Sequence, residues 1–203
     1  MIKNKSAFSM IEILVWIFIF SMWIVSVYSI IVTTLNLNDY NKNYIIASYL
    51  AREQIELVRN IRDSNYKKIQ IYNQIKPNTN DHSIVFEEWK YYKIENDFYW
   101  VSDFPIIVSK ITDFWEGESM LNSKMQNYKL CLSSDNIYTF DCSWDFIKTP
   151  FYKYIKIEKV EHSDWTNVVE IDNAFKVTSK IIWYMKWYHE FEVDSIFTDY
   201  KRF

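Results

Sequence analysis

The fold is decided by the stretch Phe8-Ser9-Met10-Ile11-Glu12-Ile13-Leu14-Val15 and by the apolar run that continues from it to about Leu35. Between Ile11 and Leu35 the sequence holds one charged residue, Glu12. A helix of this length would be about 37 Å long, which is enough to cross the hydrocarbon core of a bilayer. The stretch therefore predicts a membrane-spanning helix.

The charges on either side of this run predict its orientation. Lys3 and Lys5 precede it, and the first charged residue behind it is Asp39. Because positive charge is retained on the cytoplasmic side, the N-terminus is expected inside and the bulk of the chain outside the cytoplasmic membrane.

A carboxylate at the start of a spanning helix costs several kcal/mol unless a positive group pairs with it. The residues around it form a pattern: a short basic leader, the small residue Ala7, then Phe8, Ser9, the apolar pair Met10-Ile11, and Glu12. This pattern resembles the prepilin N-terminus of type IV pilins and type II secretion pseudopilins.

The resemblance implies that a membrane aspartyl peptidase cuts between Ala7 and Phe8 and that the new amine of Phe8 is N-methylated. That amine would be the partner of Glu12, in the same subunit or in a neighbour within a filament. The family usually has glycine before the Phe, so Ala7 puts the efficiency of processing in question. The alternative is an ordinary signal anchor whose Glu12 lies among the lipid headgroups.

The helical pattern continues beyond the apolar run. Apolar residues recur at three- and four-residue spacing on one face of an amphipathic helix, namely Ala47, Leu50, Ala51, Ile55, Val58 and Ile61. With no proline before Pro77, one long helix is expected from about Phe8 to Asp63. The run 51–59 resembles minor pilins in particular. The expected organisation is a leader (1–7), a transmembrane half-helix (8–35), an amphipathic half-helix (36–65) and a β-rich head (66–203).

The head is expected to be an antiparallel sheet against which the helix packs, an α+β fold as in pilins. Residues 64–82 are rich in Asn, Lys and Gln and predict a connector. Strand-like runs follow at 83–87, 90–94, 98–101, 106–110, 128–132 and 138–140. The runs 151–160, 175–184 and 188–197 alternate and predict a meander, whose first hairpin the run 167–171 would extend.

Two cysteines, Cys131 and Cys142, lie in the part of the chain expected outside, where disulfides persist. Their spacing is compatible with a bridge or with two free thiols. The net charge of −3 provides no electrostatic footprint for nucleic acid.

The sequence has no recognisable catalytic constellation. The histidines are scattered, and there is no glycine-rich phosphate loop or serine elbow, so an enzyme is not expected. No cofactor is expected either. Asp113, Glu116 and Glu118 could hold a Ca²⁺ ion, although a solvated acidic loop is the commoner outcome of such a cluster.

The composition includes one glycine and nine tryptophans. Average usage would give about 14 glycines. Several tryptophans stand at turn positions that favour glycine, such as Glu88-Trp89-Lys90, Asp164-Trp165 and Lys186-Trp187. We hypothesise that the gene reads UGA as glycine and that most of these positions are native glycines: Trp16, Trp23, Trp89, Trp100, Trp115, Trp144, Trp165 and Trp187. Trp183 is the expected exception, because it continues the alternation of a strand.

The sequence thus predicts a minor pilin or pseudopilin, a filament subunit of a type IV pilus or a type II secretion-like system. Its expected partners are other pilin subunits, the prepilin peptidase and methyltransferase, the assembly platform protein and ATPase, and membrane lipid. The rival from another class is a membrane-tethered binding or sensor module that stays a monomer, with the long helix as its stalk.

Overall fold

The computed structural model describes residues 9–75, 85–96, 106–112, 128–143, 146–164, 167–185 and 187–199. One helix is followed by seven strands, which are α1 (Met10–Lys67), β1 (Tyr91–Asn96), β2 (Ile106–Ile111), β3 (Lys129–Leu132), β4 (Tyr138–Thr139), β5 (Ile147–Asp164), β6 (Asn167–Tyr184) and β7 (Tyr188–Thr198). The fold is α+β, as the sequence predicts. The chain divides into two compact units, Met1–Tyr44 and Ile45–Phe203.

The second half of α1 belongs to the larger unit and packs on the sheet. All six apolar positions of the amphipathic pattern are buried there, so the predicted helix face is confirmed. The helix ends at Lys67, about one turn later than the pattern suggests. The buried side chain of Asn65 explains the extra turn, because its Nδ2 donates hydrogen bonds to the carbonyls of Tyr72 and Gln74 at 3.2 and 2.8 Å.

The C-terminus of α1 is closed by a pair of backbone hydrogen bonds. The N–H of Gln70 donates to Asn65 O at 2.9 Å, and the N–H of Ile69 donates to Tyr66 O at 3.3 Å. This is the Schellman pattern, which places a left-handed residue after the helix and usually selects glycine there. Here that residue is Ile69, with φ of 56°.

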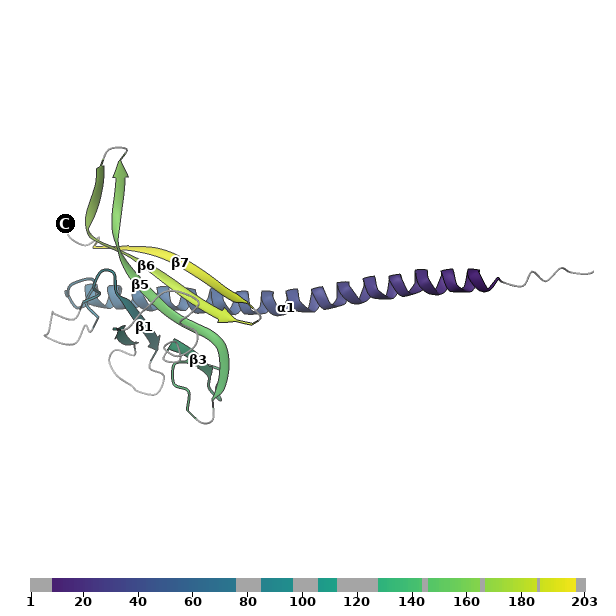
Figure 1. Ribbon diagram of the computed structural model, residues 1–203. Helices are drawn as coiled ribbons and strands as arrows, with labels where there is room; N and C mark the ends of the chain where they lie inside the picture. The colour runs from purple at the N-terminus through teal and green to yellow at the C-terminus, as the bar shows by residue number, and fades with distance from the viewer. Residues whose placement is uncertain are drawn as a thin grey trace, which may run out of the picture. The chain divides into compact units, whose positions relative to one another are not determined.

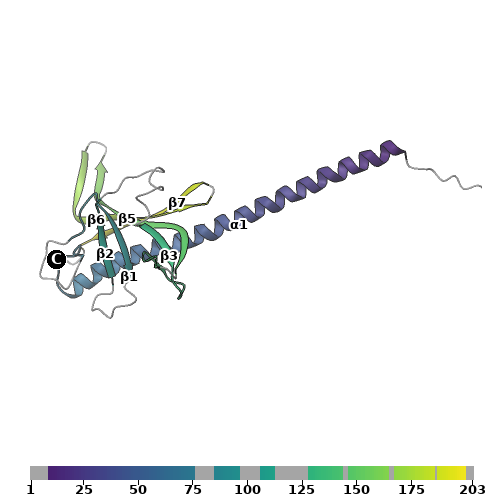
Figure 2. The ribbon, with the colours of Figure 1, turned by 60° about the horizontal axis from the view of Figure 1, so that its bottom comes forward.

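The strands form one antiparallel sheet around the long strand β5 (Figures 1 and 2). One edge of β5 pairs first with β3 and then with β1, and β1 in turn pairs with β2. The other edge of β5 pairs with β6, and β6 pairs with β7. The predicted meander of the last three strands is therefore confirmed, and residues 167–171 do extend its first hairpin as part of β6.

The predicted strands differ from the observed ones mainly at their ends. Strand β5 starts at Ile147, although Pro150 lies within it. Of the expected strand 83–87, the described residues show one isolated bridge, between Gln74 and Val85. The expected strand 98–101 lies outside the described residues.

Both faces of the sheet carry buried apolar residues. Two clusters fill the space between α1 and the sheet, and the larger one is built around Ile61, Ile94 and Ile157. A third cluster lies on the opposite face and contains Tyr152 and Tyr154. Successive residues of β5 therefore point to two faces that are both buried. This explains why polar and apolar residues alternate only weakly along this strand.

Candidate assembly site

The helix that carries Glu12 begins directly after Ser9. The carbonyl of Ser9 accepts hydrogen bonds from the N–H groups of Glu12 and Ile13 at 2.9 and 3.3 Å, and Met10 is the first helical residue. Ser9 and Glu12 thus occupy the N-cap and N3 positions, the spacing of a capping box. A carboxylate in the first turn also interacts favourably with the helix dipole. Glu12 therefore also holds the N3 position of the helix, which the sequence interpretation did not consider.

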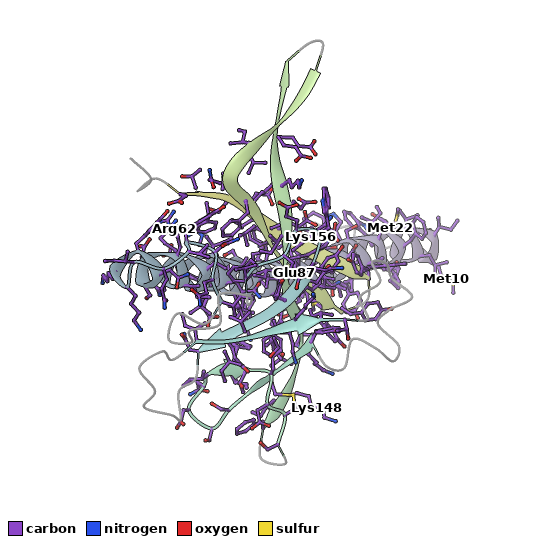
Figure 3. All side chains as sticks on the ribbon, turned by 90° about the vertical axis from the view of Figure 1, so that its left-hand side faces the viewer. Met10, Met22, Arg62, Glu87, Lys148 and Lys156 are labelled. Carbon is purple, nitrogen blue, oxygen red and sulfur yellow. A yellow bond between two sulfur atoms is a disulfide. The ribbon has the colours of Figure 1, made fainter. Side chains whose placement is uncertain are left out.

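The helix beyond Glu12 exposes apolar side chains all around its circumference, and Figure 3 draws them with Met10 and Met22 labelled. Of the hydroxyl groups along this surface, four donate to a carbonyl three or four residues earlier: Ser21 to Phe18, Ser26 to Met22, Thr33 to Ser29 and Thr34 to Ile30. Such internal pairing is what a polar group needs in hydrocarbon. By length and composition, α1 is the one helix within the described residues that could cross a membrane.

Two of the predicted sites lie outside the described residues. These are the cleavage position between Ala7 and Phe8 and the acidic loop with Asp113, Glu116 and Glu118. Elsewhere, the described part of the chain contains no group of three His, Cys, Asp or Glu side chains arranged to hold a metal ion.

Polar contacts fix the second half of α1 to the sheet. The hydroxyl of Ser179 donates to Gln54 Oε1 at 2.7 Å, and both residues are fully buried. The ammonium of Lys153, also buried, lies 3.5 Å from the carboxylate of Glu53 and 5.4 Å from the ring centre of Phe140. A buried charge that loses its partner is strongly destabilising, so these contacts favour one register between helix and sheet.

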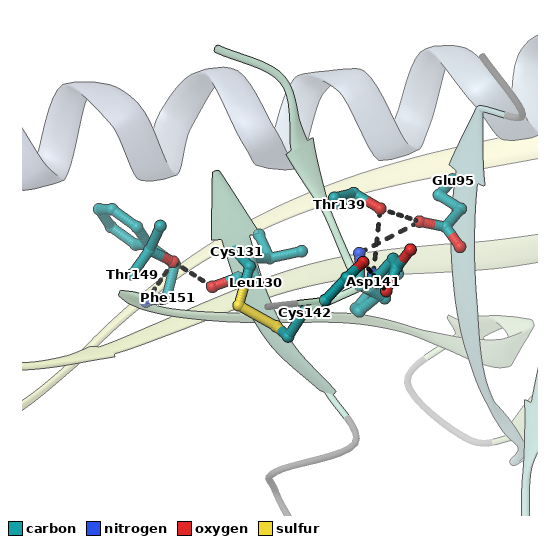
Figure 4. Close-up of a disulfide and its surroundings, with 10 residues drawn as sticks. Glu95, Leu130, Cys131, Thr139, Asp141, Cys142, Thr149 and Phe151 are labelled. Carbon is teal, nitrogen blue, oxygen red and sulfur yellow. Dashed lines mark hydrogen bonds between the residues drawn. A yellow bond between two sulfur atoms is a disulfide. The ribbon is translucent and has the colours of Figure 1, made fainter. Parts of the chain in front are cut away.

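The structure joins Cys131 and Cys142 in a disulfide with 5.4 Å between their Cα atoms (Figure 4). Cys131 is buried in β3, and Cys142 lies after β4. The carboxylate of Glu95 on β1 accepts hydrogen bonds from the Thr139 hydroxyl and the Phe140 N–H at 3.3 and 3.2 Å. The bridge and the carboxylate together hold the β3–β4 segment on the head.

The face of the sheet that points away from α1 carries a lattice of ion pairs over β5, β6 and β7. Lys176 lies 2.7 Å from Asp194 and 3.6 Å from Glu158, while Lys180 lies 2.5 Å from Glu192 and 3.1 Å from Glu190. A polar hollow of about 200 Å³ opens among these side chains. Each lysine of β6 is thus shared between carboxylates.

These contacts shift the pKa values of the groups involved. Burial alone would raise the pKa of Glu190, but hydrogen bonds from the Tyr188 hydroxyl and from Lys180 outweigh it and lower this pKa. In the same way, Lys176 overcomes the effect of burial and holds the pKa of Asp194 below its ordinary value. The hydrogen bond with Asp194 is the main reason why the pKa of Lys176 is raised.

The sequence interpretation missed this lattice. The alternation of polar residues along β6 and β7 was visible and indicated one polar face on each strand. The pairing register, Lys180 opposite Glu192 and Thr178 opposite Asp194, was not visible, because it depends on where the two strands meet.

Among the tryptophans of the glycine hypothesis, the backbone of Trp89 stands out, and the hypothesis itself stays a prediction. Trp89 has φ of 58°, a left-handed conformation that is an outlier for a bulky residue, and is 55% exposed. Trp16, Trp23 and Trp187 are exposed as well. Trp183 has no exposed surface and stacks on His189 with 5.3 Å between ring centres. The other four candidates lie outside the described residues.

Comparisons with known proteins returned nothing: no protein-family profile, no curated protein sequence and no solved structure matches this chain.

Proposed function

We propose that this protein is a minor pilin or pseudopilin, a subunit that enters a type IV pilus or type II secretion-like filament through α1. The observation that carries the proposal is the helix itself. Its first half is exposed and apolar and carries one charged residue, Glu12. One face of its second half is buried against an antiparallel sheet. An anchor needs only the first half, whereas a filament subunit needs both a helix to pack and a head fixed to it.

In this proposal Glu12 sets the axial position of the subunit. Cleavage after Ala7 would leave the amine of Phe8 four residues from the carboxylate. When the helix exchanges lipid for neighbouring helices, an unpaired carboxylate costs several kcal/mol, and only a positive group at the same depth offsets this. The pair favours docking with the N-terminus level with a neighbour's Glu12 and disfavours other offsets. The contacts of Gln54 and Lys153 fix the second half of the helix on the head.

The disulfide between Cys131 and Cys142 supports an extracytoplasmic head, because such bridges persist in oxidising compartments. The proposed topology is a single pass with the N-terminus inside, followed by extraction into a surface or periplasmic filament. The prepilin peptidase and methyltransferase, the platform protein and the ATPase are the partners that this route requires.

Three substitutions of Glu12 test the proposal and separate its charge from its capping position. Glu12→Gln keeps a residue that suits the N3 position of a capping box but removes the charge. Glu12→Val removes both, and Glu12→Asp keeps the charge with a shorter side chain. We expect all three proteins to be inserted and cleaved, Gln and Val variants to enter filaments poorly, and the Asp variant to be intermediate.

The assay shears filaments from cells and compares the sheared and membrane fractions by immunoblot. If Glu12→Gln protein reached the sheared fraction at the wild-type level while Glu12→Val protein did not, the residue would act as a helix cap and the pairing would be refuted. Wild-type levels of both variants in the sheared fraction would also refute the pairing, whereas absence of the wild-type protein itself from that fraction would favour the monomeric tether. The mass of the mature N-terminus gives a second readout, since an intact Met1 supports a tether and N-methylphenylalanine at Phe8 supports the filament.

A further inference from the structure

Strand β7 forms one edge of the sheet. Among the described strands only β6 pairs with it, over the whole register from Ala174–Thr198 to Tyr184–Tyr188. The strand is eleven residues long and contains no proline and no lysine. A long regular edge strand presents a row of backbone N–H and C=O groups to a further strand, and proteins commonly protect such edges with proline or charged side chains, lysine above all. β7 has no proline or lysine, but it carries three carboxylates, and at its last residue the Tyr66 hydroxyl donates to the carbonyl of Thr198 at 2.7 Å.

One face of β7 carries a column of carboxylates. Glu190, Glu192 and Asp194 follow one another at two-residue spacing, and their side chains are 45, 44 and 51% exposed. On the β6 side they share two lysines, Lys176 and Lys180. Three carboxylates with two cations leave this edge negative. A strand added on the open side would set its own residues opposite the same carboxylates.

The other face of β7 is apolar and incompletely covered. Phe191 and Val193 pack against the core between α1 and the sheet, yet both remain partly exposed at the edge. An added strand would place alternate side chains beside them. The two columns of β7 therefore specify a complementary pattern, in which cationic residues alternate with apolar ones.

A second copy of β7 fits this edge poorly in the register centred on Glu192. In an antiparallel pair, residues of one face lie opposite residues of the same face. Pairing centred on Glu192 would place Glu190 of each copy opposite Asp194 of the other, and like charges directly opposite destabilise a sheet. In that register the carboxylate column disfavours self-pairing, whereas it favours a strand that sets cations opposite it.

We propose that the β7 edge is a strand-addition site for an extended segment of another protein in which Lys or Arg alternates with Val, Ile or Phe. The site lies on the head and uses none of the residues that the filament proposal assigns to α1. Failure of the one proposal therefore leaves the other standing.

The test measures binding of fluorescent synthetic peptides to the full chain in detergent micelles by anisotropy. The first peptide alternates lysine and valine, the second has the same composition in two blocks, and the third is the alternating peptide N-methylated at every second residue. We expect the first to bind and the other two to bind about tenfold more weakly or worse. Binding of the first should weaken as salt is raised.

Two pairs of variants locate the site. Glu192→Lys with Asp194→Lys should weaken binding of the alternating peptide about tenfold. Glu161→Lys with Asp135→Lys changes the net charge equally at exposed positions away from β7 and should leave binding unchanged. Circular dichroism of each protein reports whether the fold is retained, and the peptide series on the wild-type chain needs no variant.

Equal affinity for the alternating and block peptides would reduce the edge to a charged surface and overturn the proposal, as would unchanged binding of the N-methylated peptide. No binding up to about millimolar peptide would also overturn it. If the chain formed a dimer and the alternating peptide dissociated it, the edge would instead be assigned to a second copy of the chain.

Discussion

Replacing Trp89 with glycine should stabilise this protein, although the substitution removes a large side chain. The residue lies in the turn before β1 with φ of 58°, and 55% of its surface is exposed. Its backbone is held there by the fold, since the N–H of Trp89 donates to Ile157 O at 2.7 Å and the N–H of Ile157 donates to Lys90 O at 3.0 Å. The turn cannot relax to negative φ without losing these bonds.

The magnitude follows from two opposing terms. A residue with a Cβ atom in the left-handed region costs about 1–2 kcal/mol, and glycine does not bear this cost. Against it stands the contact of the Trp89 ring with the ammonium of Lys156, 5.8 Å from the ring centre. At an exposed site such a contact contributes about 0.5–1 kcal/mol. The net gain is on the order of 0.5–1 kcal/mol, a rise of about 1–4 °C in Tm for a chain of this size.

Thermal unfolding of the purified protein under one set of conditions is the assay, with two controls. Trp89→Ala loses the same contact but keeps the Cβ atom, so it should be no more stable than the wild type. Trp183→Gly empties a fully buried site and should cost about 3–5 kcal/mol. A higher Tm for Trp89→Gly than for Trp89→Ala would isolate the conformational cost of a Cβ atom at this φ, because both variants lose the same side-chain contact.

A Trp89→Gly protein less stable than Trp89→Ala would refute the reasoning, because the glycine would then bring no conformational gain. The glycine hypothesis has a separate and sharper test in the gene and in the mass of the native protein. UGG codons at Trp89 and Trp187 would end it, whereas UGA codons and a native mass that fits glycine would establish it.

Four further outcomes are expected. Ala7→Leu should leave the leader attached, because the peptidase must accommodate the residue before the cut, and normal maturation on an immunoblot would show that the site is wrong. Cys142→Ser should cost about 2–4 kcal/mol of head stability and slow the non-reduced protein on a gel; complete alkylation of native thiols would contradict the bridge. Ile69→Gly should raise stability by about 1 kcal/mol in denaturant unfolding, since a β-branched residue occupies the left-handed position that closes α1, and an unchanged midpoint would count against that strain. The pKa of Asp194 is lowered in the folded protein, so its carboxylate stabilises the fold at pH values above its unfolded pKa, and this contribution should disappear as the pH falls through its folded pKa. Asp194→Asn should therefore make the free energy of unfolding less dependent on pH in the acid range. An unchanged pH dependence would refute the link to Lys176.

The long helix and the final meander could be predicted because their signals are local. The apolar positions from Ala47 to Ile61 repeat at the helical period, and the last strands alternate between short turns. Strand β5 was predicted too short for a physical reason. The residues missed at its start, 147–150, include Pro150 and pair with β3 beside a register shift, neither of which a period-two pattern expresses.

The turn at Trp89 could be predicted from the sequence, whereas the ion-pair lattice could not. The difference is that the turn depends on one residue and the lattice on the pairing of several strands. A positive φ is a property of one residue, so a tryptophan between two strand-like runs already signals a conflict. The lattice needs Lys176 and Lys180 to meet carboxylates on two other strands, and the register of those strands depends on the whole sheet. Neither strand alone indicates which of its charges will be paired.

Glu12 is the residue at which local and non-local requirements coincide. Its spacing from Ser9 satisfies a helix cap, which any helix start can use, and its depth in an apolar segment creates a charge that only another group can neutralise. Glutamine would keep the N3 position of a capping box and carry no charge into the membrane, but it would lose the favourable interaction with the helix dipole. In the proposed filament the carboxylate needs a cationic partner at that depth, and the amine that cleavage before Phe8 would expose is the partner we propose.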